Sequence, residues 1–266
     1  MTTGITVTIT SMATEPAPFL TALRLSDSFL PTGGYTSSYG LEQYLNEDRI
    51  ETADELGEII RGYLERIVGP CETVAVANAH DAATSEDLEG LLTVDERLHA
   101  VTMAAEFRES STKAGRQLSE LVLVEDGGRR VSDDGQRRRA GGDDASESGS
   151  DRPLEAAYAE AIESGETPGH YPVVFGVVAA QRGLSKREAC LAQAYSFVTG
   201  VLGATQRLGR FSHTDIQSIL AALLPVITDV CDRHADDDIA AMASFAPLTE
   251  IMGMRHERAG RRLFMS

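Results

Sequence analysis

The sequence predicts an all-α fold, a single bundle-like domain of about ten helices. Apolar residues recur three and four positions apart over most of the chain, which is the period of a helix with one buried face. Several of these stretches begin with a capping sequence, Ser/Thr-x-x-Glu/Gln. The strict alternation of a half-buried strand occurs only from Thr6 to Thr10. A chain of 266 residues is also long enough to bury a large core.

The N-terminal part of the domain is expected to hold two short helices. Residues 1–15 are rich in Thr and aperiodic, so we expect a disordered tail ahead of a domain that spans 16–266. Apolar residues predict a helix around 19–25, which ends at the turn Pro31-Thr-Gly-Gly. A second helix is expected over 35–45.

Four more helices are expected in the first half of the chain. The capping box Thr52–Glu55 opens an amphipathic helix, which we expect Gly69-Pro70 to break because proline lacks an N–H. Proline at a first helical position then suits a new helix over 70–83. Ser85 is expected to cap the helix after that, and one more helix follows through Leu121.

Residues 125–152 have almost no apolar side chain and cannot offset the entropy of ordering by burial. We predict a disordered loop, both acidic and rich in Arg. Arg137–Arg139 offer a site for an acidic partner; the alternative, which we favour, is a solvated loop that neutralises its own Asp residues.

The second half is expected to hold longer helices. They start at Pro153 and His170, then at the capping boxes Ser185–Glu188 and Thr214–Gln217, and the last runs from Leu248 into the basic C-terminus. One side of the helix after Ser185 is expected to bury Ala189, Ala192, Tyr195, Val198 and Leu202.

The net charge of −17 opposes binding to nucleic acids and to anionic membrane surfaces, so neither is an expected partner. Lys113 and Lys186 are the two lysines, and the other basic residues are Arg. An Asp/Glu-rich, Lys-poor surface is typical of proteins from a salt-saturated cytoplasm, so we predict a halophilic source. A GC-rich genome is the alternative, since it favours Arg over Lys, but it does not account for the charge.

Localisation is expected to be cytoplasmic. The three cysteines are far apart and odd in number, so they imply no disulfide framework. The first thirty residues lack the pattern of a signal peptide. The longest apolar run, Val173–Ala180, is too short to span a bilayer.

The sequence holds no recognisable catalytic set, and we identify no catalytic or cofactor-binding residue. Pro31-Thr-Gly-Gly lacks the Lys of a phosphate-binding loop. Weak metal-ligand candidates are Cys231 and His234, three positions apart on one helix, and His256 near the C-terminus. For all three, a structural or surface role is the favoured interpretation.

Four blocks of sequence carry a family resemblance. They are SDSFLPTGGYTSSYGLE (26–42), EFRESSTKAGRQL (106–118), HYPVVFG (170–176) with the later QRLG (206–209), and RHE with RLFMS (255–266). In this order they resemble the UreF family of urease accessory proteins. The chain departs from the family pattern in the insertion at 125–152 and at Tyr35, where Phe is more usual.

The resemblance implies a non-catalytic, all-α scaffold that forms a homodimer. It implies two partners, the accessory protein UreD (also called UreH) and the GTPase UreG, in a complex that passes Ni²⁺ to apo-urease. No cofactor is expected, because the complex handles nickel and this chain does not bind it stably. The runner-up is an all-α metal-dependent enzyme whose site is assembled from distant residues.

The resemblance and the charge pattern together suggest where partners bind. In an acidic protein, the basic strip at residues 255–262 suits charge-assisted pairing, and Leu263 and Phe264 add an apolar anchor. We expect residues 255–266 to order on binding UreD, buttressed by Pro31–Glu42; the alternative is a last helix that packs on its own core. The expected partner-binding residues are Pro31, Gly33, Gly34, Tyr35, Ser37, Gly40, Glu42, Arg255, His256, Glu257, Arg262, Leu263 and Phe264.

The charge composition generates a first prediction. Salt screens repulsion among surface carboxylates, so the free energy of unfolding should rise between about 0.1 M and about 3 M KCl. Urea unfolding at each salt concentration measures it. Equal stability in both would contradict the halophilic interpretation.

Overall fold

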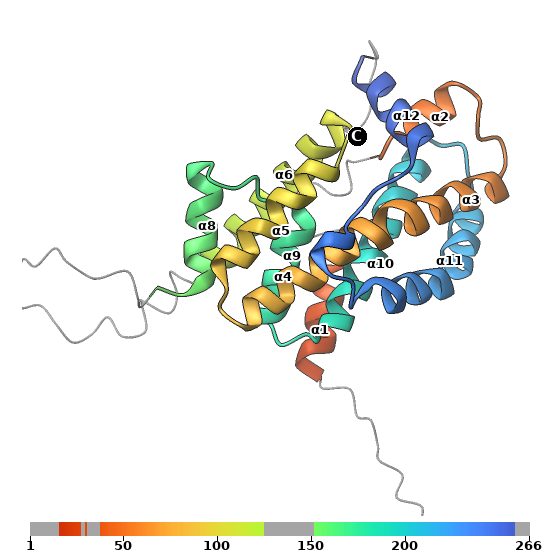
Figure 1. Ribbon diagram of the computed structural model, residues 1–266. Coiled ribbons are helices and arrows are strands. Elements are labelled where there is room, and N and C mark those ends of the chain that lie inside the picture. Colours follow the sequence, from red (N-terminus) through yellow and green to blue (C-terminus); the bar gives the residue numbers. More distant parts are fainter. Residues whose placement is uncertain (1–15, 28–29, 31–37, 125–151, 259–266) are drawn as a thin grey trace, which may run out of the picture.

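A computed structural model describes residues 16–27, 30, 38–124 and 152–258 (Figure 1). Its α-helices are α1 (Pro16–Leu25), α2 (Leu41–Asn46), α3 (Ala53–Tyr63), α4 (Val74–Thr84), α5 (Leu88–Val101), α6 (Ala105–Leu118), α8 (Leu154–Ser164), α9 (Tyr171–Gln181), α10 (Lys186–Arg207), α11 (His213–His234) and α12 (Pro247–Glu257). Wider π turns form η2 (Leu64–Thr73) and η3 (Ser119–Val124), and η4 (Ile239–Ala241) is a 3₁₀ turn. No strand occurs among these residues, which confirms the all-α prediction. The predicted tail at 1–15, the Pro31–Gly34 turn, the insertion up to residue 151 and residues 259–266 lie outside the described residues.

Helices α4 and α9 pack against each other at the centre of the bundle (Figure 1). Helix α9 is apolar all round, and every residue from Pro172 to Ala179 is buried, as expected of a core helix. Gly176 permits the close approach, because a Cβ there would lie 2.6 Å from the carbonyl oxygen of Val76 on α4. The remaining helices surround this pair.

Gly69-Pro70 does not break the helix, contrary to the prediction. The chain is helical without interruption from Ala53 to Thr84, and the π turns of η2 accommodate Pro70 in the middle. The Arg66 carbonyl cannot accept from Pro70, which has no N–H, and it accepts instead from the Phe245 amide at 3.3 Å. The Pro70 carbonyl accepts from the Ala243 amide at 3.0 Å. The segment that leads into α12 therefore satisfies backbone groups at the π distortion.

The cap predicted at Ser85 is wrong. Asp87 caps α5, because its backbone is extended and its side chain accepts from the Gly90 amide at 2.9 Å. Ser85 instead ends α4, where its hydroxyl donates to the Asp81 carbonyl at 2.8 Å.

The capping box predicted at Thr214–Gln217 lies two residues earlier. The hydroxyl of Ser212 accepts from the Asp215 amide, and the Asp215 carboxylate accepts from the Ser212 amide. Asp fills the role that the sequence pattern reserves for Glu or Gln. The boxes at Thr52 and Ser185 are confirmed.

The buried side predicted for α10 is right except at Tyr195, which is 37% exposed. Ala194 and Phe197 are the buried residues on that turn, and Tyr195 lies at the edge of the buried face.

Helix α11 is long and apolar enough by composition to cross a membrane. Its inner face packs on α3, η2 and α10 and buries six aliphatic side chains: Ile216, Ile219, Leu223, Val226, Ile227 and Val230. We therefore describe α11 as a packing helix of the bundle.

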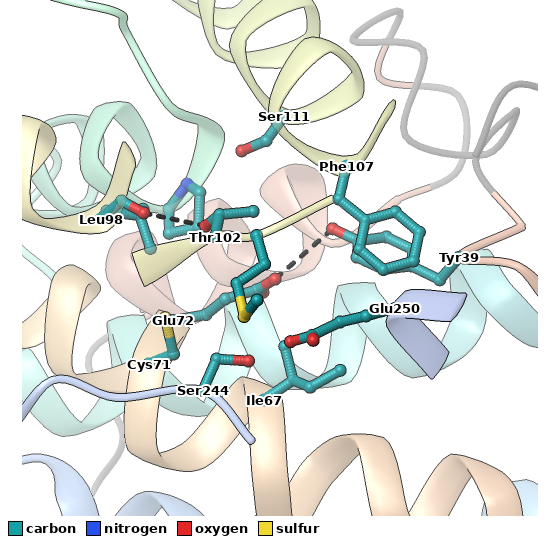
Figure 2. A pocket seen from close by; sticks show the side chains of 12 residues that line it. Tyr39, Ile67, Cys71, Glu72, Leu98, Thr102, Phe107, Ser111, Ser244 and Glu250 are labelled. Carbon is teal, nitrogen blue, oxygen red and sulfur yellow. Dashed lines mark hydrogen bonds between the residues drawn. The ribbon is translucent and has the colours of Figure 1, made fainter. Parts of the chain in front are cut away.

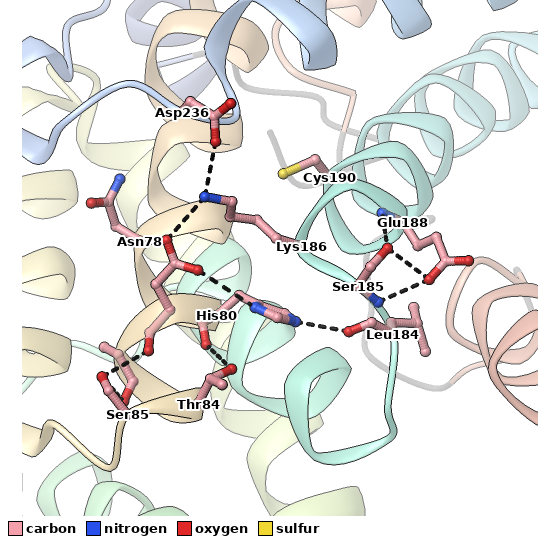
Figure 3. A network of polar contacts seen from close by, with 12 residues as sticks. Asn78, His80, Thr84, Ser85, Leu184, Ser185, Lys186, Glu188, Cys190 and Asp236 are labelled. Atoms are coloured by element: carbon pink, nitrogen blue, oxygen red, sulfur yellow. Dashed lines mark hydrogen bonds and ion pairs between the residues drawn. The ribbon is translucent and has the colours of Figure 1, made fainter.

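Lys186, one of the two lysines, joins three elements (Figure 3). From the start of α10 its Nζ lies 3.1 Å from Asp81 on α4 and 2.9 Å from Asp236 after α11. Asp236 is the main reason that the pKa of Lys186 is raised. Nearby, the His80 ring nitrogen Nε2 lies 2.8 Å from the Leu184 carbonyl, which ties α4 to the turn before α10.

The α4–α9 contact generates a prediction of opposite sign at two glycines. Gly176→Ala should destabilise the fold by about 2 kcal/mol, because its methyl group would overpack the interface. Gly203→Ala, in α10 with no atom within 4 Å of the new Cβ, should stabilise it by up to about 1 kcal/mol. Denaturant unfolding in one KCl concentration measures both. Equal changes in the free energy of unfolding would show that Gly176 is not required for the close contact between α4 and α9.

Candidate partner-binding surface

Residues of three of the four sequence blocks meet where α12 lies against α2 and α6. His256 on α12 places Nδ1 2.8 Å from Oε1 of Glu106 on α6 and Nε2 3.0 Å from Oε2 of Glu42 on α2. The His256 side chain is fully buried, and the two carboxylates are nearly so. We call this arrangement the Glu42–His256–Glu106 bridge.

The bridge holds α12 in place because one side chain joins three helices. Each ring nitrogen of His256 lies at hydrogen-bond distance from a carboxyl oxygen, one on α6 and one on α2. Buried polar groups are costly unless they are hydrogen-bonded, so removing His256 takes a hydrogen-bond partner from each of two buried side chains.

Close backbone packing supports the bridge. Gly40, with φ of 78°, precedes α2, and a Cβ there would lie 3.2 Å from the Gly253 amide nitrogen. A Cβ at Gly253 would lie 2.8 Å from the ring of Phe107 on α6. Glycine at both positions thus lets α12 approach α2 and α6 closely.

The outer side of the same helix is apolar and exposed. Leu248, Ile251 and Met254 follow one another at three-residue spacing and are 49%, 46% and 38% exposed. Phe245, just before α12, is 72% exposed, and Met103, between α5 and α6, is 60% exposed. We call these five residues the α12 apolar face. A gathering of large exposed apolar side chains is typical of a protein-interaction site.

Charged groups border this face at the end of α12. Arg255 is exposed and lies 2.9 Å from Glu47, and Glu257 and Arg258 are also exposed. An apolar centre with a charged rim is the usual composition of a protein interface.

A small cavity of about 30 Å³ lies beneath the face (Figure 2). Its lining includes Met103, Ser244 and Glu250 on the side of α12 and Glu72 on η2. Most of the lining is apolar, and the cavity has room for water beside the few polar groups.

Glu72 and Glu250 are two buried acids that line this cavity, and Glu72 lies on the π segment η2. The Glu72 carboxylate accepts from Gln193 Nε2 at 2.7 Å and from the Tyr39 hydroxyl at 3.4 Å, as Figure 2 shows for Tyr39. Burial raises the pKa of Glu72 to about 7, although both hydrogen bonds favour the charged form. Burial also raises the pKa of Glu250.

The third sequence block is held by a different carboxylate. Asp95 on α5 accepts from Thr167 Oγ1 and the Gly169 amide at 2.6 Å, from the His170 amide at 2.9 Å and from the Tyr158 hydroxyl at 3.2 Å. Burial raises the pKa of Asp95 against these four hydrogen bonds. Asp95 therefore fixes the turn that leads into the core helix α9.

His170 itself joins two further polar groups. Its Nδ1 lies 3.1 Å from Ser111 Oγ, and its Nε2 lies 3.0 Å from His99 Nδ1. Burial lowers the pKa of His170 to about 3, so the ring is neutral.

The weak metal-ligand candidates are engaged elsewhere. Cys231 is buried in the core, where burial raises the pKa of its thiol to about 12. His234 Nδ1 lies 2.7 Å from Asp237 Oδ2, and both nitrogens of His256 face carboxylates. Within the described ranges, no group of three or more His, Cys, Asp or Glu residues is placed to hold a metal ion.

The expected partner-binding residues divide into three groups. Gly40, Glu42 and His256 are buried where the inner side of α12 meets α2. Arg255 and Glu257 are exposed beside the apolar face. Pro31, Gly33, Gly34, Tyr35, Ser37, Arg262, Leu263 and Phe264 lie outside the described residues.

Sequence reasoning missed Glu72 and the apolar stripe of α12. Glu72 had a signal, since it is a lone acid in the otherwise apolar and uncharged run Ile67–Ala77. The stripe Leu248, Ile251, Met254 is periodic, but the sequence does not tell an outward stripe from an inward one.

Comparisons with known proteins agree on one family. A family model described as UreF matches residues 50–224. The chain is 31% identical to "Urease accessory protein UreF" of Trichodesmium erythraeum over 245 residues, which covers 92% of this chain and 95% of that protein. It is 30% identical to "Urease accessory protein UreF 1" of Brucella melitensis, over 92% and 91% of the two chains, and 28% identical to a Yersinia enterocolitica protein, over 91% and 95%.

The bridge generates a stability prediction. His256→Ala should lower the free energy of unfolding by about 3 kcal/mol, because a fully buried side chain and its hydrogen bonds to Glu42 and Glu106 would be lost together. Arg255→Ala, on the exposed neighbour, should cost less than about 1 kcal/mol. Denaturant unfolding compares the two variants, and a similar small loss in both would contradict the role given to His256.

Proposed function

The chain belongs to the UreF family of urease accessory proteins, and we propose that it acts as the scaffold that joins UreD to the GTPase UreG during nickel insertion into apo-urease. On this proposal the protein works as a cytoplasmic homodimer. Its membership of an accessory family confirms that it is not an enzyme. The runner-up, a metal-dependent enzyme, has no supporting cluster in the described part of the chain.

The observation that carries the proposal is the fixed α12 helix with its exposed outer side. Buried residues from the first, second and fourth sequence blocks hold the inner side of α12. The outer side presents the α12 apolar face to solvent. A rigid apolar surface avoids part of the ordering cost of association, which favours tight docking.

UreD is the partner we assign to the α12 apolar face. The face leads directly into residues 259–266, for which the basic and apolar sequence predicts a docking tail. The face has an apolar centre with Arg255 and Arg258 exposed at its edge, which suits a partner with an apolar patch bordered by carboxylates.

A substitution within the α12 apolar face tests the assignment of UreD to it. Ile251→Asp places a charge at the centre of the α12 apolar face and should weaken UreD binding by about 30-fold or more, the scale of an interface hot spot. Leu224→Asp is a matched control, because Leu224 on α11 has the same 46% exposure. Size-exclusion chromatography with light scattering, in multi-molar KCl with UreD and UreG, reads out each variant.

The wild-type chain and Leu224→Asp should enter a complex with UreD and UreG, whereas Ile251→Asp should remain apart from UreD. A wild-type chain that stays monomeric and ignores both proteins would overturn the proposed function. UreD binding that tolerates Ile251→Asp would overturn only the assignment of the face.

A further inference from the structure

We propose that Glu72 is a proton-binding site coupled to docking, so that the protein takes up a proton when a partner covers the α12 apolar face. Docking would then be tighter at lower pH. The inference rests on the proposed function, because it requires a protein partner on that face.

The cavity connects Glu72 to the face. Met103 belongs both to the cavity lining and to the α12 apolar face. Ser244 and Glu250, also in the lining, are adjacent in sequence to Phe245 and Ile251 of the face. A partner seated on Met103 and Phe245 would therefore close the outer wall of the cavity and dry its interior.

Drying the cavity disfavours a carboxylate. The charged form of a buried acid loses more from desolvation than the neutral form does. Gln193 and Tyr39 already donate to the two oxygens of Glu72. Because Glu72 is buried and both oxygens already have a donor, a partner on the face does not pair with the charge directly.

The neighbouring titratable groups do not supply a positive charge to Glu72. Tyr39, Tyr171, Cys71 and Glu250 face Glu72 or share its cavity, and burial raises the pKa of each. The two phenols and the thiol are therefore neutral near pH 7, and Glu250 is an acid. Arg97 on α5 acts on Cys71, and its guanidinium donates to the Met242 carbonyl at 3.0 Å.

The sign of the effect follows from linkage. Below about pH 7 the Glu72 carboxyl is protonated both before and after docking, so its contribution to affinity is constant. Above that pH Glu72 is a carboxylate in the free protein, so Glu72 must take up a proton when the partner docks. Affinity should therefore fall as pH rises through the pKa of Glu72, by up to about tenfold for each unit that docking raises it.

Calorimetry of UreD binding tests the inference with full-length proteins. Wild type, Glu72→Gln and Glu65→Gln are titrated at about pH 6.5 and about pH 8.5, each in two buffers of different ionisation enthalpy. Gln has the size of a protonated Glu and removes the titration at position 72. Glu65 is the control, an exposed acid on the same π segment.

We expect wild type and Glu65→Gln to bind UreD about tenfold more weakly at the higher pH and to take up a proton there. Glu72→Gln should lose that part of the pH dependence and of the proton uptake. The same pH dependence in all three proteins, or no proton uptake by wild type, would overturn the inference but not the proposed scaffold function. Absence of UreD binding at either pH would overturn the proposed function and this inference with it.

Discussion

The arrangement of the C-terminal helix depends on one imidazole between two buried carboxylates. His256 brings together Glu42 from the start of the domain and Glu106 from its middle, each within 3.0 Å. Buried polar groups are costly unless they are hydrogen-bonded, so this contact stabilises one position of α12 and penalises others. Gly40 and Gly253 then allow the helices to approach closely enough for the pairing. Because the inner side of α12 is fixed in this way, the outer side is a preformed surface.

The π segment η2 links that surface to the core. Pro70 has no N–H for the Arg66 carbonyl, which accepts from the Phe245 amide, and the Pro70 carbonyl accepts from the Ala243 amide. The same segment places Glu72 in the cavity below the α12 apolar face. The α12 apolar face, the buried Glu72 and the core helix α4 are therefore all linked to η2.

Local signals in the sequence identified most helices because caps and apolar spacing are properties of neighbouring residues. Thr52 and Ser185 show this, and the predicted buried side of α10 is confirmed at Ala189, Ala192, Val198 and Leu202. The prediction of a helix break failed at Pro70, because backbone carbonyls there accept hydrogen bonds from amides more than 170 residues away. Glu42, Glu106 and His256 each belonged to a recognised block, yet their meeting depends on the packing of three helices. Spacing along the chain does not encode such a contact.

Hydrogen exchange of the full-length chain, alone and with UreD, tests the central claim most directly. Exchange reports local opening, so a fixed helix that becomes covered should lose exchange along its length. The account predicts added protection over Phe245–Met254 on binding, with little change over α11. Unchanged exchange over α12, with protection gained on another face, would contradict it.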